Sequence, residues 1–246
     1  MIQEYEKIFN HLKEITQSSS PLKTAYNYNA YKNNSDYQLV NQAVIARDKN
    51  FVIGTGETIY WNLPKDMENF KNDTLNSIVI MGRVTFNSFP KDKSGCYLTL
   101  KDRLNIVISR NAQEYYKENL NNTKFKQNLF FVESLEQAHL LSLLIFTQDQ
   151  SVKALEQSFA LKPGLISTIG GERVYLESLD KENVLIPLTD LILTEVDLVL
   201  DTNAECKKFI FNEKDYQENY NLQQTFNGAG ENSAYVKCIK RHLKLV

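Results

Sequence analysis

The chain has 246 residues, a formal net charge of −2, and hydrophobic and charged fractions of 42% and 24% that are ordinary for a globular protein. The length suits one large domain or two small ones, and the balanced charge argues against nucleic acid or an anionic membrane as a partner. No apolar stretch approaches the roughly 20 residues that cross a bilayer, and the N-terminus resembles neither a secretory signal nor a transit peptide, so we expect a cytoplasmic protein.

The N-terminal region is predicted to be a helix followed by an arm. Ile8, Leu12 and Ile15 recur at helical spacing, which predicts an amphipathic helix from residue 1 to about residue 16. Residues 22–36 are rich in Asn, Tyr and Lys without periodicity and are predicted to form an extended arm. The apolar stripe of the helix is expected to dock on the core or on another chain. We therefore separate residues 1–37 from a folded domain over residues 38–246.

The folded domain shows an α/β pattern. Buried strands are predicted over residues 39–46, 77–81, 105–108 and 165–169. Helical stretches follow the second and the fourth of them, which predicts a single domain with a central, mostly parallel sheet and helices on both faces. After Leu191 the pattern changes to strands without helices, over residues 191–194 and 235–239, which predicts an antiparallel edge at the C-terminus.

Three of the predicted strands end in residues suited to phosphate. These ends are Gly82-Arg83, Ser109-Arg110 and Gly170-Gly171. Ligands of parallel α/β sheets bind beyond the carboxyl ends of the strands, glycine allows close backbone approach, and arginine binds phosphate with two hydrogen bonds. Together these ends indicate a dinucleotide phosphate site without the G-x-G-x-x-G fingerprint. Taken singly, a Gly-Gly pair is more often a plain turn, and a strand-end arginine is usually solvated.

The segment from Trp61 to Phe70 is the most specific in the chain. Pro64 favours a helix start, and Asp66 and Phe70 lie four residues apart on one helical face. A carboxylate and an aromatic ring on one inward face could bind a flat polar heterocycle. The motif places Asp66 as the only acidic residue on the inward face. Two plainer alternatives stay open: Asp66 favours a helix N-terminus, as acidic residues do, and Trp61 belongs to the core.

Cysteines and histidines indicate no metal site. The three cysteines are odd in number and share no metal-ligand spacing, which argues against a disulfide framework and favours buried thiols in a reducing compartment. The three histidines are isolated in the sequence, so neither a metal centre nor a catalytic triad is predicted.

In combination, these motifs resemble the dihydrofolate reductase family. The similar segments are Ile53-Gly54, Trp61-Asn62-Leu63-Pro64, Asp66, Phe70-Lys71, Thr74, residues 79–85, residues 103–110, Ile169-Gly170-Gly171, Val174-Tyr175, Leu193-Thr194 and Asp201-Thr202. They follow the order of the family and span about Leu39 to the C-terminus. The resemblance implies an NADPH-dependent reductase that transfers a hydride to C6 of dihydrofolate, with protonation at N5.

The resemblance also implies roles for individual residues. The catalytic group would be Asp66, Trp61 and Thr194, with Asp66 binding the pterin amino group and promoting protonation. The substrate would contact Val44, Ile45, Asp66, Phe70, Lys71, Phe89, Leu100, Arg103, Ile169 and Thr194, with Arg103 holding its glutamate carboxylate. NADPH would contact Ala46, Ile53, Gly82, Arg83, Thr85, Ser109, Arg110, Gly170, Gly171, Glu172, Val174 and Tyr175.

The sequence also departs from the family pattern. Tyr60 replaces the usual proline before the tryptophan, and Asp102 replaces the usual glycine before the arginine, although aspartate tolerates positive φ better than most residues. The arm and an insertion around residues 139–161 resemble protozoan forms, which are often fused to thymidylate synthase. A protein partner is therefore possible through the arm or through such a fusion.

Two alternatives to an active dihydrofolate reductase remain. A reductase-like subunit could serve as a non-catalytic interaction module, although the acid, the tail arginine and the phosphate contacts are all present. A pyrimidine reductase of riboflavin synthesis could share a similar fold, but the run from Trp61 to Asp66 argues against it.

Overall fold

The computed structural model describes residues 2–17, 38–55, 59, 61–121, 128–152, 160–199, 206–229 and 235–246. The α-helices are α1 (Ile2–Gln17), α4 (Pro64–Thr74), α5 (Arg83–Asn87), α6 (Ala112–Asn119), α7 (Leu135–Phe146) and α9 (Glu172–Ser178), and the 3-10 helices are η2 (Gln150–Val152), η3 (Glu213–Asp215) and η4 (Tyr220–Leu222). The strands are β1 (Val40–Asp48), β2 (Val52–Thr55), β3 (Ile78–Gly82), β4 (Leu104–Ile108), β5 (Leu129–Val132), β6 (Leu165–Gly170), β7 (Asp190–Val196), β8 (Cys206–Lys208), β9 (Tyr216–Glu218), β10 (Gln224–Ala229) and β11 (Tyr235–Leu245).

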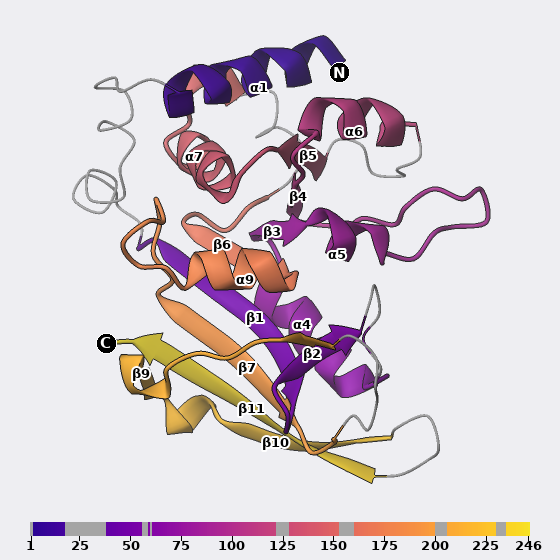
Figure 1. Ribbon diagram of the computed structural model, residues 1–246, viewed down its shortest axis with the longest axis vertical. Helices are drawn as coiled ribbons and strands as arrows, with labels where there is room; N and C mark the ends of the chain where they lie inside the picture. Colours follow the sequence, from indigo (N-terminus) through magenta and orange to yellow (C-terminus); the bar gives the residue numbers. More distant parts are fainter. Residues whose placement is uncertain are drawn as a thin grey trace.

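A nine-stranded sheet runs through the molecule in the order β10-β11-β7-β1-β6-β3-β4-β5, with β9 paired to β11 (Figure 1). The strands from β7 to β5 are all parallel to one another. Strand β11 is antiparallel to β7, β9 and β10. The predicted parallel sheet with an antiparallel C-terminal edge is therefore confirmed.

Helices cover both faces of this sheet, as the pattern of β1 shows. Successive strand residues point to opposite faces. On one face, Gln42 donates a side-chain hydrogen bond to the main-chain oxygen of Asp73 in α4, at 2.7 Å. On the other face, Ala43 and Ile45 pack in one buried cluster with Tyr175 of α9. The prediction of helices on both faces is therefore confirmed.

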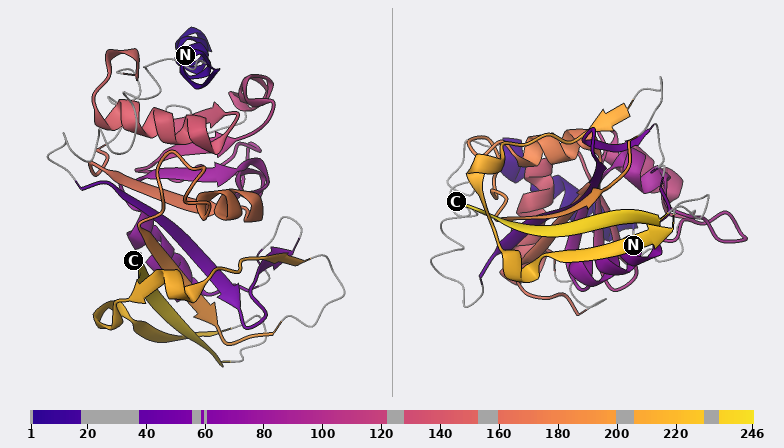
Figure 2. Two further views of the ribbon diagram at one scale, coloured as in Figure 1. Left: turned by 60° about the vertical axis from the view of Figure 1, so that its left-hand side comes forward. Right: turned by 90° about the horizontal axis from the view of Figure 1, so that it is seen from below.

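Helix α1 covers the β5 edge of the sheet. Figures 1 and 2 show it beside α7, at the opposite end of the molecule from β10 and β11. Its buried residues, which join the main hydrophobic core, are Tyr5, Ile8, Phe9, Leu12 and Ile15. The Tyr5 hydroxyl donates to the main-chain oxygen of Phe131 in β5 at 2.9 Å, and its ring stacks on Tyr116 with centroids 3.7 Å apart. The predicted apolar stripe thus docks on the core, and it shields an edge strand.

Helix α7 contains the first part of the stretch predicted to be an insertion. Residues 139–146 lie in this helix, and ten of its twelve residues are buried. His139 is fully buried, its Nδ1 accepts a hydrogen bond from the Ile186 amide, and burial lowers its pKa to about 3. These residues belong to the core of the domain, whereas residues 153–159 lie outside the described part of the chain.

Strands β2 and β8 form a separate two-stranded antiparallel sheet. Ile53 and Gly54, which belong to the segments similar to the dihydrofolate reductase family, lie in β2. Tyr60, Asp201, Thr202 and the predicted arm of residues 22–36 lie outside the described residues. Within the described ranges, no helix is long and apolar enough to cross a membrane.

Candidate active site

Helix α4 contributes five residues to the lining of one cavity of about 980 Å³. As predicted, the helix begins at Pro64, with no side-chain cap at Leu63. Asp66, Phe70 and Asp73 all line the cavity, and their spacings of four and seven residues place them on one helical face. The expectation of Asp66 as the only acidic residue on this face is therefore wrong, because Asp73 extends the same stripe.

Asp66 is a half-buried carboxyl group with one hydroxyl partner. Burial raises its pKa above the ordinary aspartate value, and the neighbouring Asp73 raises it further. A hydrogen bond from Thr194 and the charge of Lys240 act in the opposite direction. Thr194 is buried in β7, so its hydroxyl is held in place by the sheet. The balance favours a carboxyl group that keeps a proton at a higher pH than an exposed aspartate does.

Apolar side chains from several elements enclose the space beside Asp66. The predicted residues that line it are Val44, Ile45, Ala46, Ile53, Phe70, Phe89, Leu100 and Ile169. Further apolar lining residues that the motifs did not indicate are Ile59, Met67, Pro90, Leu98 and Ile192. The space is therefore suited to a flat, largely apolar ring that carries a few polar groups.

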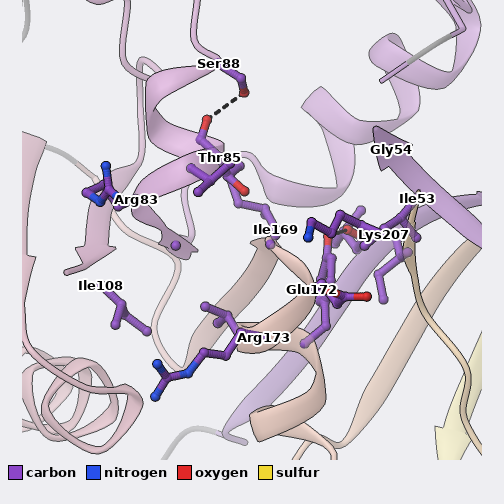
Figure 3. A pocket seen from close by; sticks show the side chains of 18 of the residues that line it. Ile53, Gly54, Arg83, Thr85, Ser88, Ile108, Ile169, Glu172, Arg173 and Lys207 are labelled. Atoms are coloured by element: carbon purple, nitrogen blue, oxygen red, sulfur yellow. Dashed lines mark hydrogen bonds between the residues drawn. The ribbon is translucent and has the colours of Figure 1, made fainter. Parts of the chain in front are cut away.

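The opposite part of the cavity is formed by strand ends. The predicted residues from the ends of β3, β4 and β6 all line it: Gly82, Arg83, Thr85, Ser109, Arg110, Gly170, Gly171, Glu172, Val174 and Tyr175. Figure 3 shows Thr85 and Ile169 between Arg83 on one side and Ile53 and Glu172 on the other. Arg83 and Arg110 are exposed, and the Arg83 guanidinium lies 5.7 Å from the ring centroid of Tyr115. This part of the cavity is suited to an anionic ligand.

The turn after β6 requires glycine. Gly170 has φ of +143° and is joined to Gly171 by a cis peptide bond. A Cβ atom on Gly170 would lie 2.8 Å from Oγ1 of Thr85, closer than real Cβ contacts occur. The backbone of this turn therefore approaches α5 at a distance that a side chain would prevent.

Comparison with known proteins agrees with this geometry. The dihydrofolate reductase family profile matches residues 41–241. The chain belongs to the dihydrofolate reductase family. This membership confirms the resemblance drawn from the sequence motifs, while the roles of individual residues stay predictions.

Family relatives match different shares of the chain. A dihydrofolate reductase of Buchnera aphidicola subsp. Baizongia pistaciae is 32% identical over 142 residues, which are 58% of this chain and 65% of that protein. The dihydrofolate reductase of Neisseria gonorrhoeae is 30% identical over 164 residues, which are 65% of this chain and 75% of that protein. Bifunctional dihydrofolate reductase-thymidylate synthase 2 of Arabidopsis thaliana is 32% identical over 181 residues, which are 70% of this chain and 26% of that protein. The chain thus spans less than two thirds of the first relative.

Three residues to which the family resemblance assigns roles do not line the cavity. Trp61 is buried in a cluster with Leu63, Val196 and Cys238, which is the packing of a core residue. The Lys71 side chain is exposed on α4. The third residue is Arg103, whose guanidinium group is held by the protein itself.

Arg103 is buried below the end of α4. It is 4% exposed, and its guanidinium donates to Oγ1 of Thr74 at 2.9 Å and to the main-chain oxygens of Lys101 and Lys71 at 2.7 and 2.6 Å. Burial lowers its pKa, and Asp102 acts in the opposite direction. Asp102 has φ of +59°, so the turn survives without glycine, as predicted. Guanidinium carries five N–H donors, so these three hydrogen bonds use only part of the donor capacity of Arg103.

The end of β5 adds a site region that the family motifs did not indicate. Glu133, Ser134 and Glu136 line the cavity. Ser134 caps α7 by accepting a hydrogen bond from the Gln137 amide at 3.2 Å. Lys13 of α1 lies 3.6 Å from Glu133, which links the N-terminal helix to the rim of the cavity. A Ser-x-x-Gln pattern directly after an apolar run was the sequence signal that could have located this helix start.

Arg173 and Lys207 also line the cavity without having been predicted (Figure 3). Arg173 pairs with Glu177 at 2.6 Å along α9. Among the described residues, no group of three or more His, Cys, Asp or Glu side chains could hold a metal ion.

Proposed function

We propose that the chain catalyses the NADPH-dependent reduction of 7,8-dihydrofolate to tetrahydrofolate. The observation that carries the proposal is the arrangement of a single cavity. A sheltered carboxyl group, Asp66, lies among apolar walls at one end, and arginine-bearing strand ends lie at the other. Family membership supports the same reaction, because the matched relatives are named dihydrofolate reductases.

The strand ends fit NADPH. Gly170 and Gly171 line the cavity at the end of β6, and because they carry no side chains their backbone could approach a pyrophosphate closely. Arg83 and Arg110 would recognise the additional phosphate that distinguishes NADPH from NADH, and Thr85 and Ser109 would donate hydrogen bonds to the phosphates. Ala46 and Ile53 would border the nicotinamide ring. When bound, NADPH supplies the hydride that reduces C6 of the pterin.

Residues at the other end would hold dihydrofolate. Asp66 would accept hydrogen bonds from the pterin amino group and ring nitrogen, and Thr194 would orient both Asp66 and the amino group. Phe70 and Ile169 would enclose the pterin ring and exclude water, which favours proton retention on Asp66 and delivery to N5. Arg103 would bind the α-carboxylate of the substrate's tail through its remaining donors.

An assay of purified full-length protein tests this function directly. NADPH oxidation should depend on added dihydrofolate and should fall sharply in the Asp66→Asn variant. Cofactor binding without turnover would favour a non-catalytic interaction subunit. Turnover of a pyrimidine substrate in place of dihydrofolate would favour a reductase of riboflavin synthesis.

A fusion with thymidylate synthase stays a prediction, although relatives in Arabidopsis thaliana and Leishmania major carry the bifunctional name. A protein partner through the N-terminal arm, the division of the chain at residue 37 and a cytoplasmic location also stay predictions.

A further inference from the structure

Helix α4 and strand β11 bring a second carboxylate and a lysine next to Asp66. Asp73 lines the same cavity as Asp66, seven residues further along the helix. The Lys240 ammonium donates to Oδ1 of Asp73 at 2.7 Å, and the two side chains are only 12% and 20% exposed. Lys240 pairs in register with Thr194, the hydrogen-bond partner of Asp66. The ion pair therefore lies beside the strand that carries the hydrogen-bond partner of Asp66.

The position of this pair is fixed from two sides. Gln42 of β1 donates to the main-chain oxygen of Asp73 at 2.7 Å, which ties the last turn of α4 to the sheet. Lys240 ties the Asp73 side chain to β11. A half-buried carboxylate without a partner cation is unfavourable, so removing Lys240 alone would leave the charge of Asp73 uncompensated.

We propose that Lys240 is a positioning residue for Asp66, because its ammonium group pairs with the neighbouring Asp73 and so sets the charge that the proton-holding Asp66 experiences. The inference rests on the proposed function, and it deepens that function by dividing the work between two acids on one helical face. When two carboxyl groups share one active site, differences in their surroundings commonly push their pKa values apart and give them different roles.

Other charged or titratable groups near Asp66 do not replace Lys240. On β11, Cys238 faces the same side as Lys240, and burial raises its pKa to about 11, with Asp66 and the more distant Asp197 adding to the rise. Its thiol is therefore neutral. His242, further along this face, is bonded to Asp190 at 2.7 Å.

The other charged residues beside α4 are Arg103, which donates to Thr74 and to the main-chain oxygen of Lys71, and Asp48 of β1. Strand β10 contains no titratable residue, and the residues of β1 on this face, Gln42, Val44 and Ala46, are uncharged. Asp48 continues the same face of β1 but accepts hydrogen bonds from the Asn50 and Val52 amides. Within α4, Lys65 and Glu68 pair with each other at the exposed surface.

The proposal predicts opposite effects for the two partners. In Lys240→Met, Asp73 loses its cation and repels the charged form of Asp66, so the pKa of Asp66 should rise. In Asp73→Asn, Lys240 is left without its carboxylate and attracts the charged form of Asp66, so the pKa should fall. Two helical turns separate the two acids by about 10 Å, so each shift should be on the order of half a pH unit. The double variant should lie close to the wild type.

The test combines two measurements on the full-length protein. Carbon-13 NMR of labelled aspartate carboxyl groups, with Asp66 assigned by its loss in Asp66→Asn, gives the pKa of Asp66 without any turnover. The pH profile of single-turnover NADPH oxidation with dihydrofolate should move in the same direction as the NMR titration. Lys240→Arg should restore the wild-type pKa, and Lys237→Met provides the matched control, since Lys237 is exposed on the opposite face of β11.

Opposite shifts in the two single variants, cancelled in the double variant, would support the proposal. Shifts of the same sign, or none in either variant, would overturn it, even if both variants lose stability. If Lys240→Met does not fold, the double variant and Asp73→Asn decide the question by the same comparison. Absence of dihydrofolate turnover in the wild type would refute the proposed function, while the NMR titration would still decide the role of Lys240.

Discussion

The two ends of the cavity are built on different principles. At the proposed substrate end, Asp66 and Thr194 are sheltered, and Arg103, which does not line the cavity, is fixed by three hydrogen bonds. At the proposed cofactor end, Arg83 and Arg110 are exposed, and three glycines, Gly82, Gly170 and Gly171, line the cavity. Buried groups act through desolvation and fixed partners, whereas exposed charges are screened by salt. Substitutions at the substrate end should therefore cause large, salt-insensitive losses, and those at the cofactor end smaller, salt-sensitive ones.

Asp66→Asn should cause the largest loss. The variant keeps the size of the side chain and removes the ionisable group, and positioned proton transfer contributes about 10²–10⁴-fold to rates. The rate at neutral pH should fall by that factor, with NADPH affinity little changed. The loss should shrink as the pH falls, because solvent can then protonate the substrate. Near wild-type turnover at neutral pH would show that Asp66 only favours the helix start.

The same variant should be more stable than the wild type at neutral pH. The pKa of Asp66 is raised in the folded state, so its favourable contribution is full below the unfolded pKa, near pH 4, and is lost as the pH rises through the folded value. Thermal unfolding should show a gain in Tm at pH 7 that vanishes towards pH 4. A variant without any such gain would argue that the carboxyl group is not sheltered.

Arg103→Leu should have the next largest effect. It should weaken both dihydrofolate binding and folding stability. Loss of the partner for the tail carboxylate should weaken dihydrofolate binding by about 2–5 kcal/mol. The unpaired acceptors at Thr74, Lys71 and Lys101 should cost about 1–3 kcal/mol of folding stability. NADPH affinity should change little, and a pterin without the glutamate tail should be unaffected at temperatures where the variant is folded. Equal losses for both pterins would assign Arg103 to the fold alone.

The contrast between the two ends also explains what sequence alone could reveal. The strand ends and the start of α4 follow local rules, so Gly82, Arg110 and Asp66 could be placed from glycine, arginine and proline positions. The antiparallel edge could likewise be predicted, because strands without intervening helices cannot continue a parallel sheet. Local patterns were therefore sufficient to predict the position of a residue where that position depends only on the residues next to it in the sequence.

Features that depend on distant partners could not be found in this way. Asp73 pairs with Lys240, 167 positions away, and no spacing rule connects them. Helix α7 is buried on nearly every side, so it lacks the amphipathic period by which helices are recognised, and only the Ser134 cap marks its start in the sequence. Strand β5 is a four-residue apolar run, too short to be distinguished from a helical turn.

Arg110→Ala tests the cofactor end and should have a moderate effect. Removing an exposed guanidinium that recognises the additional phosphate of NADPH should raise the KM for NADPH about tenfold. The KM for NADH should change little. The difference should diminish as salt rises, because the charge is exposed. Lys93→Ala, which removes an exposed cation that does not line the cavity, is the matched control. Equal effects on both cofactors would remove Arg110 from this role.

Deletion of residues 1–36 should have the smallest effect on turnover and a large effect on stability. It removes the buried stripe of α1 and exposes the β5 edge, a loss on the order of 5 kcal/mol. The partly exposed Lys13–Glu133 pair links α1 to the cavity rim, and such pairs contribute little. The folded fraction should therefore keep its kcat and its KM for dihydrofolate, and its KM for NADPH should change by less than about threefold.

Point variants separate the two parts of this prediction. Ile8→Ala should cost about 2–5 kcal/mol in denaturant unfolding, whereas Ile2→Ala, at a position 41% exposed on the same helix, should cost little. Lys13→Met should reproduce any change in the KM for NADPH without the loss of stability. A more than tenfold fall in the kcat of still-folded deletion protein would show that α1 shapes the active site itself. Both ends of the cavity would then depend on α1, and the difference between the two ends would matter less than the packing of this helix against the sheet edge.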